Sequence, residues 1–369
     1  MTTPETAVAV ERHGDVLVAT LNNPPVNALS TAVRQGLVDA VDAAEADPTV
    51  RALLLVGQGR DFCAGADIKE FGKPRLPPTL PEVCSRLESC GKLVVAAIRG
   101  VALGGGLEVA LSAHYRLAAQ NARMGLPEVL LGLLPGAGGT QRTPRIIGVA
   151  AALDLILSGK QVSAKQALEW GLADKLTAGD DILAEGLAYA RELLDAGAAP
   201  RPTSRRADAL GDRAAAQAAL DAARAETAKR SRGLLSPFKI LDAVQAALDQ
   251  PFEEGMKIER AAFLECMDSP QRAGLVHAFF AERETARVPE AKRGQARPFD
   301  ITGVIGGGTM GTGIAVSLLQ AGLKVTLIER DDAALDRARA NIGKIYDGFV
   351  AKARVSEATR AETLQRLAY

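Results

Sequence analysis

Two glycine-containing turns in the first half of the sequence have the residues needed to hold an oxygen atom that carries negative charge. They are the run 62–68 (FCAGADI) and the run 104–108 (GGGLE), which opens a predicted helix. Glycine lets a substrate approach the backbone closely, and the first N–H groups of a helix have no partners within it. If the fold brings the turns together, they supply two backbone donors to one oxyanion. Tight turns without a ligand are the alternative.

Two glutamates lie at or beside such turns. Glu108 is on the first turn of the predicted helix, between Leu107 and Val109, and Glu128 follows the run GLP. A carboxyl group buried among apolar residues resists ionisation, so it can act as an acid near neutral pH. Each glutamate taken singly has a solvated surface charge as its alternative.

A third glycine-rich turn lies towards the other end of the sequence. The run 301–305 (ITGVI) predicts a strand, and a helix is predicted from 312 onward. A GxGxxG pattern between a strand and a helix lets a pyrophosphate reach the helix N-terminus. Its glycines are Gly306, Gly308 and Gly311.

An acidic residue completes this dinucleotide pattern. Glu329 ends a second predicted strand, 324–328, and lies 23 positions after the first glycine. A carboxylate there accepts hydrogen bonds from ribose hydroxyls and repels a 2′-phosphate, so we expect NAD rather than NADP. Position 307 is expected to tolerate any residue. A glycine-rich turn without a ligand is the alternative.

The segments around these turns predict strands that alternate with helices, which favours an α/β fold. Apolar runs predict strands at 16–21, 52–56, 93–98 and 115–119. Helical patterns are found at 31–46 behind a Ser30 N-cap, at 81–91 and at 107–113.

Residues 181–286 have no strand signal and are predicted to be helical with loops, including a helix over the Ala-rich run 205–230. The polar run 288–298 is bracketed by prolines and predicts a linker. Near the other end, helices are predicted at 332–354 and from about 356, and no third strand is expected there.

The composition excludes several classes of protein. The 369 residues include 44 Lys and Arg and 44 Asp and Glu, so the charge balance does not favour a nucleic-acid binder. A hydrophobic content of 47% excludes disorder over the whole chain. The four cysteines form no CxxC pair and the three histidines are scattered, so no metal site is expected. No secretory signal or apolar run long enough to span a membrane is present, and we expect a cytoplasmic protein.

The order of these motifs resembles the crotonase, or enoyl-CoA hydratase/isomerase, superfamily over residues 5–190. The runs that carry the resemblance are NPPVNALS (23–30), FCAGADI (62–68), GVALGGGLE (100–108), GLPE (125–128) and LLPGAGGT (133–140). The resemblance implies a crotonase-type ββα spiral core. It also implies an acyl-CoA thioester as the substrate.

The resemblance also assigns roles to individual residues. It implies that the N–H groups of Ala66 and Gly105 form the oxyanion hole, and that Glu108 and Glu128 are the catalytic carboxyl groups. We expect Glu108 to activate the water and Glu128 to give the proton to Cα. Positions matching the regions that hold the substrate and its CoA are Val26, Ala28, Ala66, Asp67 and Ile68.

The helical part ends in AFFAER (278–283) and is followed by the dinucleotide pattern. This arrangement resembles the β-oxidation multifunctional enzymes, which join a hydratase/isomerase to a 3-hydroxyacyl-CoA dehydrogenase. The resemblance implies a hydratase/isomerase domain at 1–190, a helical segment with a linker at 191–290, and an incomplete NAD-binding domain, a partial Rossmann unit, at 291–369.

The expected function is hydration of trans-2-enoyl-CoA, with Δ3-Δ2-enoyl-CoA isomerase activity at the same site. The alternatives are mainly an isomerase, or a non-catalytic NAD-binding remnant. We expect dehydrogenase activity only in a longer chain, because two recognisable strands after residue 300 are too few for a complete dinucleotide site. The sequence leaves open the acyl chain length and whether the protein is a monomer or a homo-oligomer.

Overall fold

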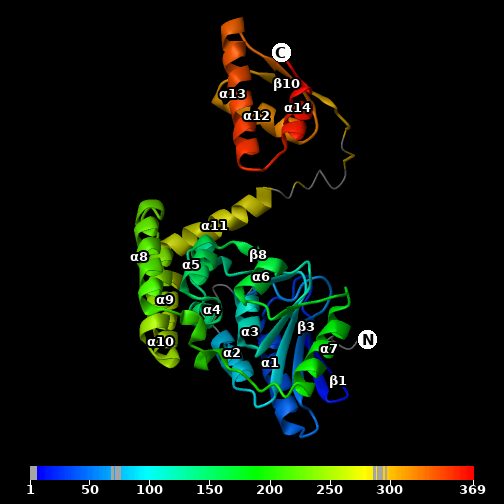
Figure 1. The fold of residues 1–369 in the computed structure, drawn as a ribbon, viewed down its shortest axis with the longest axis vertical. Coiled ribbons are helices and arrows are strands. Elements are labelled where there is room, and N and C mark those ends of the chain that lie inside the picture. The colour runs from blue at the N-terminus through cyan, green and yellow to red at the C-terminus, as the bar shows by residue number, and fades with distance from the viewer. Residues whose placement is uncertain (1–5, 68–69, 71–75, 286–287, 289–293, 296) are drawn as a thin grey trace. The chain divides into compact units, whose positions relative to one another are not determined.

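The chain forms two compact units, Met1–Glu284 and Thr285–Tyr369, in a computed structural model (Figure 1). The structure describes residues 6–67, 70, 76–285, 288, 294–295 and 297–369, so most of the predicted linker at 288–298 lies outside the described residues. The boundary expected at residue 190 does not separate compact units. Helical residues such as Ile240 and Leu241 share a core with the strands of the first unit.

The first unit begins with strands that alternate with helices, as predicted. Its elements up to residue 195 are β1 (Val8–His13), β2 (Val16–Leu21), α1 (Thr31–Ala46), β3 (Ala52–Gly57), α2 (Leu80–Glu88), β4 (Leu93–Ile98), β5 (Val101–Leu103), α3 (Gly105–Ser112), β6 (Tyr115–Ala118), β7 (Arg123–Gly125), the 3₁₀ helix η2 (Pro127–Leu131), α4 (Gly139–Ile147), α5 (Val149–Ser158), β8 (Gln161–Ser163), α6 (Ala164–Trp170), β9 (Lys175–Leu176) and α7 (Ile182–Asp195).

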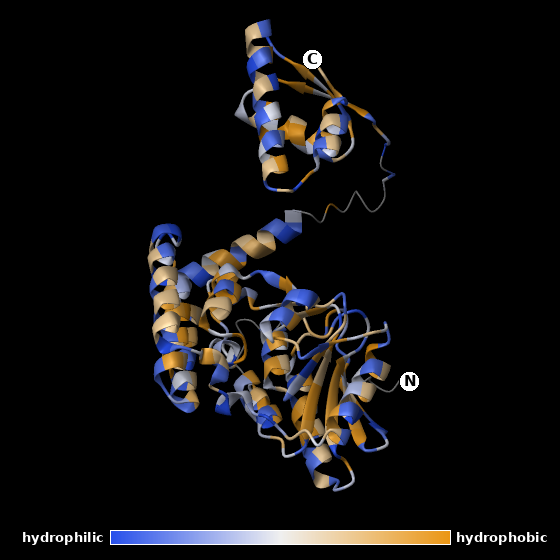
Figure 2. Cartoon of the chain, viewed as in Figure 1, coloured by the Kyte–Doolittle hydropathy of each residue, from blue (hydrophilic) through white to orange (hydrophobic). Residues whose placement is uncertain are grey.

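Both faces of the larger sheet are buried. Within the described residues it has six strands in the order β1-β2-β3-β4-β6-β9, and β1 is antiparallel to β2 while the other neighbours are parallel. Leu53 and Leu55 pack in the layer with α1, α2 and α3, and Leu54 packs in the layer with α7. Strands buried on both faces need apolar residues at every position, which gives the hydrophobic runs visible in Figure 2.

A smaller sheet places the turns that carry the two glutamates next to each other. β5 pairs in parallel with β7, and β7 pairs antiparallel with β8. β5 leads into α3, and β7 leads into η2. The Gly104 N–H donates to the Gly125 carbonyl over 2.9 Å, and this hydrogen bond joins the end of β5 to the end of β7.

The rest of the first unit is helical, as predicted for 181–286. Its elements are η3 (Thr203–Arg205), η4 (Asp208–Leu210), α8 (Arg213–Arg230), α9 (Leu235–Asp249), α10 (Phe252–Met267) and α11 (Pro270–Thr285). The helix expected from residue 205 instead begins at Arg213. Gly211 has a φ of +66°, and Asp212 caps α8 by accepting from the Ala215 N–H over 2.8 Å, so the chain turns before the helix.

The second unit is a three-stranded parallel sheet, within the described residues, flanked by helices. Its elements are β10 (Ile301–Ile305), α12 (Thr309–Gln320), β11 (Lys324–Ile328), α13 (Asp332–Ala351), α14 (Glu357–Leu364) and β12 (Leu367–Ala368). The expectation of no third strand is wrong. β12 has only two residues, which is too short for an apolar run to show in the sequence, and it is defined by its pairing with Val325 and Thr326.

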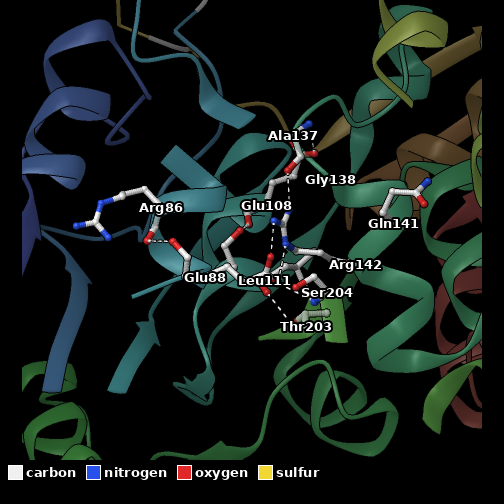
Figure 3. Close-up of polar contacts among 12 residues, drawn as sticks. Arg86, Glu88, Glu108, Leu111, Ala137, Gly138, Gln141, Arg142, Thr203 and Ser204 are labelled. Atoms are coloured by element: carbon white, nitrogen blue, oxygen red, sulfur yellow. Dashed lines mark hydrogen bonds and ion pairs between the residues drawn. The ribbon is translucent and has the colours of Figure 1, made fainter. Parts of the chain in front are cut away.

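A buried ion pair ties the helices of the first unit together (Figure 3). The Arg142 guanidinium on α4 contacts both carboxylate oxygens of Glu88 on α2, at 3.3 and 2.9 Å. Arg142 is fully buried and Glu88 is 5% exposed. The Ser204 N–H donates to the same carboxylate over 2.9 Å. The pair therefore joins α2, α4 and η3 in the interior.

We expect Arg142→Met to lower the free energy of unfolding of the first unit by about 3–5 kcal/mol, because Glu88 is left as an unpaired buried charge. Thermal and urea unfolding followed by circular dichroism measure the loss. The matched control is Arg224→Met, which breaks an exposed pair with Asp242 and costs less than about 1 kcal/mol. The double variant Glu88→Gln, Arg142→Met is expected to lose less than the sum of the single variants, and additive losses would contradict the coupling.

Candidate active site

The turn that carries Ala66 is held from both sides. The Leu103 N–H donates to the Cys63 carbonyl over 3.0 Å, and the Leu29 N–H donates to the Gly65 carbonyl over 2.9 Å. Gly65 has a φ of +109°, and a Cβ there would lie 3.0 Å from the Leu103 carbonyl oxygen. Glycine is therefore required at position 65, and the backbone of Ala66 is set beside the end of β5.

The backbone N–H of Gly105 lies close to that of Ala66. Gly104 has a φ of +52°, and Gly105 is the first residue of α3. A Cβ placed on Gly105 would lie 3.8 Å from the Ala66 nitrogen and 2.6 Å from Leu80 Cδ2. The structure records no hydrogen bond from either N–H to another described residue. The two turns predicted to form an oxyanion hole are thus brought together, with two donors available to one acceptor.

Glu108 is buried on the first turn of α3 and is 3% exposed. Its Oε1 accepts from the N–H groups of Ala137 and Gly139 over 2.7 and 2.8 Å (Figure 3 shows Glu108 with Ala137). Burial raises the pKa of this carboxyl above its ordinary value, while the two N–H donors and the charge of Arg142 act in the opposite direction. Glu108 is therefore buried but supported in its ionised form.

Glu128 has a different environment in η2. Its Oε1 lies 3.1 Å from the position that a Cβ on Gly104 would occupy. Its Oε2 is buried and has no hydrogen-bond partner among the described residues. Burial, then the charges of Glu108 and Glu259, hold the pKa of Glu128 well above its ordinary value. This carboxyl group is therefore favoured in its protonated form.

The two glutamates and the two N–H groups form one chemical unit. Because Glu128 is beside Gly104, and Glu108 is one helical turn beyond it with its N–H bonded to the Gly104 carbonyl (3.0 Å), all four groups surround the same turn. The arrangement offers a proton donor, a proton acceptor and two donors for a developing negative charge. Those are the requirements for proton transfer to and from carbon next to a carbonyl group.

The residues expected to hold the substrate and its CoA lie partly around this turn. The Val26 carbonyl accepts from the Ala64 N–H over 3.0 Å, and Ala28 precedes Leu29, which pairs with Ala66. Asp67 follows directly. Ile68 lies outside the described residues. The loop of Val26 and Ala28 is thus beside the turn of Ala66, as those expectations require.

A further carboxyl group beside this site, that of Glu259, was missed by sequence reasoning. Glu259 on α10 is fully buried and accepts from the N–H groups of Gly138 and Thr140 over 2.7 and 2.9 Å. Burial and the charge of Glu108 raise the pKa of Glu259 to about 8, against the effect of its donors on Thr140 and Gly138. The available signal was its place in a stripe of otherwise small residues on α10, namely Gly255, Glu259, Ala262 and Cys266.

The glycine-rich turn of the second unit fits a phosphate group. Gly306 has a φ of +90°, and no atom lies within 4 Å of a Cβ placed on Gly306 or Gly308. A Cβ on Gly311 would lie 1.7 Å from the Gly306 carbonyl oxygen, so only glycine allows this packing of α12 on the turn. Open space in front of a helix N-terminus is the feature that binds the pyrophosphate of a dinucleotide.

Glu329 is hydrogen-bonded to the same turn, because its Oε1 accepts a hydrogen bond from the Gly307 N–H over 2.7 Å. This hydrogen bond and the Arg330 N–H lower the pKa of Glu329, so a carboxylate faces the turn. The expectation that position 307 tolerates any residue is wrong, because a Cβ there would lie 2.4 Å from the Cβ of Ala338. Gly307 is needed to let α13 approach.

In the part of the chain that the structure describes, no group of three or more His, Cys, Asp and Glu is arranged to hold a metal ion. The helices in that same part include none that is long and apolar enough to cross a membrane.

Comparisons with known proteins find matches for both units of the chain. Residues 11–232 match the family Enoyl-CoA hydratase/isomerase, and residues 301–369 match 3-hydroxyacyl-CoA dehydrogenase, NAD binding domain. Among solved structures, an enoyl-CoA hydratase/isomerase from Pseudoalteromonas atlantica is 26% identical with a TM-score of 0.57, and the match covers 75% of this chain and 97% of that one. A carnitinyl-CoA hydratase from Mycobacterium avium is 29% identical with a TM-score of 0.56 and the same coverage.

Curated relatives match across both units. A peroxisomal bifunctional enzyme of Danio rerio is 42% identical over 332 residues, which are 88% of this chain and 45% of that protein. A peroxisomal fatty acid beta-oxidation multifunctional protein of Oryza sativa is 37% identical over 91% of this chain and 48% of that protein. The chain thus spans about half the length of these relatives. It belongs to the enoyl-CoA hydratase/isomerase family and continues into a segment of the 3-hydroxyacyl-CoA dehydrogenase NAD-binding type.

Proposed function

We propose that the first unit hydrates trans-2-enoyl-CoA thioesters to 3-hydroxyacyl-CoA thioesters, as a step of fatty acid β-oxidation. The observation that carries this proposal is a pair of glutamates in unlike environments, Glu108 buried and Glu128 half-buried with a buried Oε2, beside two neighbouring backbone N–H groups. Glu108 accepts two N–H groups, whereas Glu128 Oε2 accepts none from the described residues. A base and an acid are therefore available at one carbonyl-binding turn.

The reaction uses each group in turn. The N–H groups of Ala66 and Gly105 donate to the thioester oxygen and stabilise the enolate, which makes Cβ open to attack. Glu108 accepts a proton from a water molecule as the water oxygen bonds to Cβ, and Glu128 gives its proton to Cα. Glu108 then holds the proton taken from the water, and transfer of that proton to Glu128 restores the site.

The same arrangement supports isomerisation of 3-enoyl-CoA to 2-enoyl-CoA. Here one carboxyl group takes a proton from Cα and returns it to Cγ while the oxyanion hole holds the enolate. Glu128 in its ionised form is the group we propose for both steps, in contrast to hydration, where it acts in its protonated form. Isomerisation therefore does not require water activation by Glu108. Hydration and isomerisation are therefore expected together, with Glu108 needed for hydration alone.

The second unit is proposed to bind the adenosine, ribose and pyrophosphate part of NAD. Gly306, Gly308 and Gly311 would face the pyrophosphate, and Glu329 the ribose hydroxyls. Bound NAD accepts a hydride in dehydrogenation. That residues 1–369 do not catalyse this oxidation by themselves stays a prediction. The cytoplasm as the place of action also stays a prediction, as does a protein that binds no nucleic acid and is either a monomer or a homo-oligomer.

We expect Glu128→Gln to lower hydration and isomerisation by about 10²–10⁴-fold, because the general acid is lost. Glu108→Gln is expected to lower hydration similarly while retaining much more isomerisation. The loss of absorbance from the conjugated thioester of crotonyl-CoA measures hydration. Glu169→Gln makes the same chemical change on an exposed residue of α6 and serves as the control. Full hydration by either active-site variant would contradict the mechanism.

Gly105→Ala is expected to lower both activities by about 10²–10³-fold, since the new Cβ would clash with Leu80 Cδ2 at 2.6 Å beside the Ala66 nitrogen and displace the proposed oxyanion hole. Steady-state rates with crotonyl-CoA and a 3-enoyl-CoA measure the effect. Gly274→Ala on α11 has no atom within 4 Å of its Cβ and is the matched control. Ordinary turnover by Gly105→Ala would place the oxyanion hole elsewhere.

Glu329→Ala is expected to weaken NADH binding about tenfold, because hydrogen bonds from the ribose to a charged acceptor are lost. NADPH binding is expected to change less or to improve, since repulsion of the 2′-phosphate is removed. Fluorescence titration with both nucleotides measures the preference. Asp336→Asn, on an exposed side chain of α13, is the control. An unchanged preference for NADH would show that Glu329 does not contact the ribose.

A further inference from the structure

Two buried glutamates divide four successive backbone N–H groups between them. The N–H groups of Ala137 and Gly139 donate to Glu108 Oε1. Those of Gly138 and Thr140 donate to Glu259. The Thr140 hydroxyl adds a third bond to Glu259 Oε2 at 2.5 Å. The turn 137–140 is thus held from one side by α3 and from the other by α10.

The position of Glu259 is set by close packing of α10 on α4. A Cβ placed on Gly255 would lie 2.0 Å from Gln141 Oε1 and 2.8 Å from its Cδ, so α10 packs directly on the Gln141 side chain of α4. The Gln141 side chain also donates to the Ala243 carbonyl on α9 over 2.8 Å. Glu259 is one turn along from Gly255 on the same face. The packing of α10 on α4 therefore fixes the position of the Glu259 carboxyl group relative to the turn 137–140.

The alternation of donors makes the two carboxylates depend on each other. Here the N–H groups of residues 137 and 139 point to Glu108, and those of residues 138 and 140 point to Glu259. If Glu259 loses an acceptor, a buried N–H of Gly138 or Thr140 is left without a partner, which costs about 1–3 kcal/mol unless the turn rotates. Rotation would turn the Ala137 and Gly139 N–H groups away from Glu108. Misplacement of a reacting group by about 1 Å can cost about 10²-fold in rate.

We propose that Glu259 is a positioning residue for hydration, which holds the turn 137–140 in the conformation that orients Glu108 as the base. The inference rests on the proposed function, and it concerns a residue outside the matched range 11–232. The helical segment after that range would then complete the hydratase site within the same chain.

The charged groups that face Glu259 come from several elements. They are Glu108 on α3, Glu128 on η2 and Arg142 on α4. Glu128 has no hydrogen bond to the turn 137–140 among the described residues. A substitution at Glu259 is therefore expected to change the orientation of Glu108 through the hydrogen bonds of the turn. It is expected to act on Glu128 only through the change in charge. This difference separates positioning from a general structural role.

The test compares hydration with isomerisation in Glu259→Gln. The amide keeps the size of the side chain but replaces one acceptor oxygen with a donor opposite Thr140. We expect the kcat for hydration of crotonyl-CoA to fall at least about tenfold. Isomerisation of a 3-enoyl-CoA is expected to stay within about threefold, because it uses Glu128. In a Glu108→Gln background, Glu259→Gln should lower hydration little further.

Two more variants complete the experiment. Glu254→Gln changes an exposed glutamate of the same helix, paired with Lys257, and should leave both activities unchanged. Thr140→Val removes the hydroxyl that donates to Glu259 and accepts from the Gln141 amide, while the Thr140 N–H is kept, and it should lower hydration in the same selective way. It decides the matter if Glu259→Gln does not fold.

Three results would overturn the inference. The first is equal loss of hydration and isomerisation in Glu259→Gln and Thr140→Val. The second is undiminished hydration in either. The third is independent, multiplicative losses in the double variant with Glu108→Gln. A wild-type chain without hydration or isomerisation would instead overturn the proposed function, and the inference with it.

Discussion

Burying several carboxyl groups around one turn is costly, and much of the first unit is arranged to meet that cost. A carboxylate removed from water needs hydrogen-bond donors or a counter-charge, or it takes up a proton. Glu108 and Glu259 receive the four N–H groups of residues 137–140. Arg142 then binds the Ala137 carbonyl over 2.8 Å and pairs with Glu88. The carbonyl side of the turn is therefore linked to α2, and its N–H side to α3 and α10.

The proposed roles of proton acceptor and proton donor follow from the unequal hydrogen bonding of the two carboxyl groups. Glu108 is stabilised as an anion by two donors, whereas Glu128 Oε2 has none within the described residues and lies near two other glutamates. Two like side chains thereby acquire different affinities for a proton without any difference in residue type. The titrations of such close groups are coupled, so the proton belongs to the pair more than to either residue.

Local sequence patterns predicted those elements whose burial or capping depends on residues within or next to the element itself. The structure confirms the strands at 16–21 and 93–98 and the helix at 31–46 with its Ser30 cap. Burial on both faces of a strand produces a continuous apolar run, and a helix cap is a residue next to the helix, so both can be recognised from adjacent residues. Features that depend on contacts with residues distant in the sequence could not be recognised in this way. β12 is defined by its partner strand, and the need for glycine at 307 comes from Ala338 on a distant helix.

The site shows the same division between local and distant information. The motifs around Ala66, Gly105, Glu108 and Glu128 were recognisable because each is a turn or helix start with its own residue pattern. The structure brings these positions around one turn, while their catalytic roles remain predictions. Glu259 acts on residues 119 and 121 positions away, and a glutamate within a helix has no pattern that reveals such a partner.

This separation in sequence bears on where the hydratase unit ends. A boundary at 190 or at 232 would exclude α9 and α10, which supply the Ala243 carbonyl to Gln141 and Glu259 to the turn 137–140. Without them, the Gly138 and Thr140 N–H groups would face a gap in place of an acceptor, next to the N–H groups that support Glu108. The turns of the candidate site come from the αβ part of the unit, but the N–H groups of Gly138 and Thr140 in one of them find their acceptor on a helix that follows later in the chain. The compact unit Met1–Glu284, with its helical segment included, therefore contains the partners of Glu88, Glu108 and Glu259 described above.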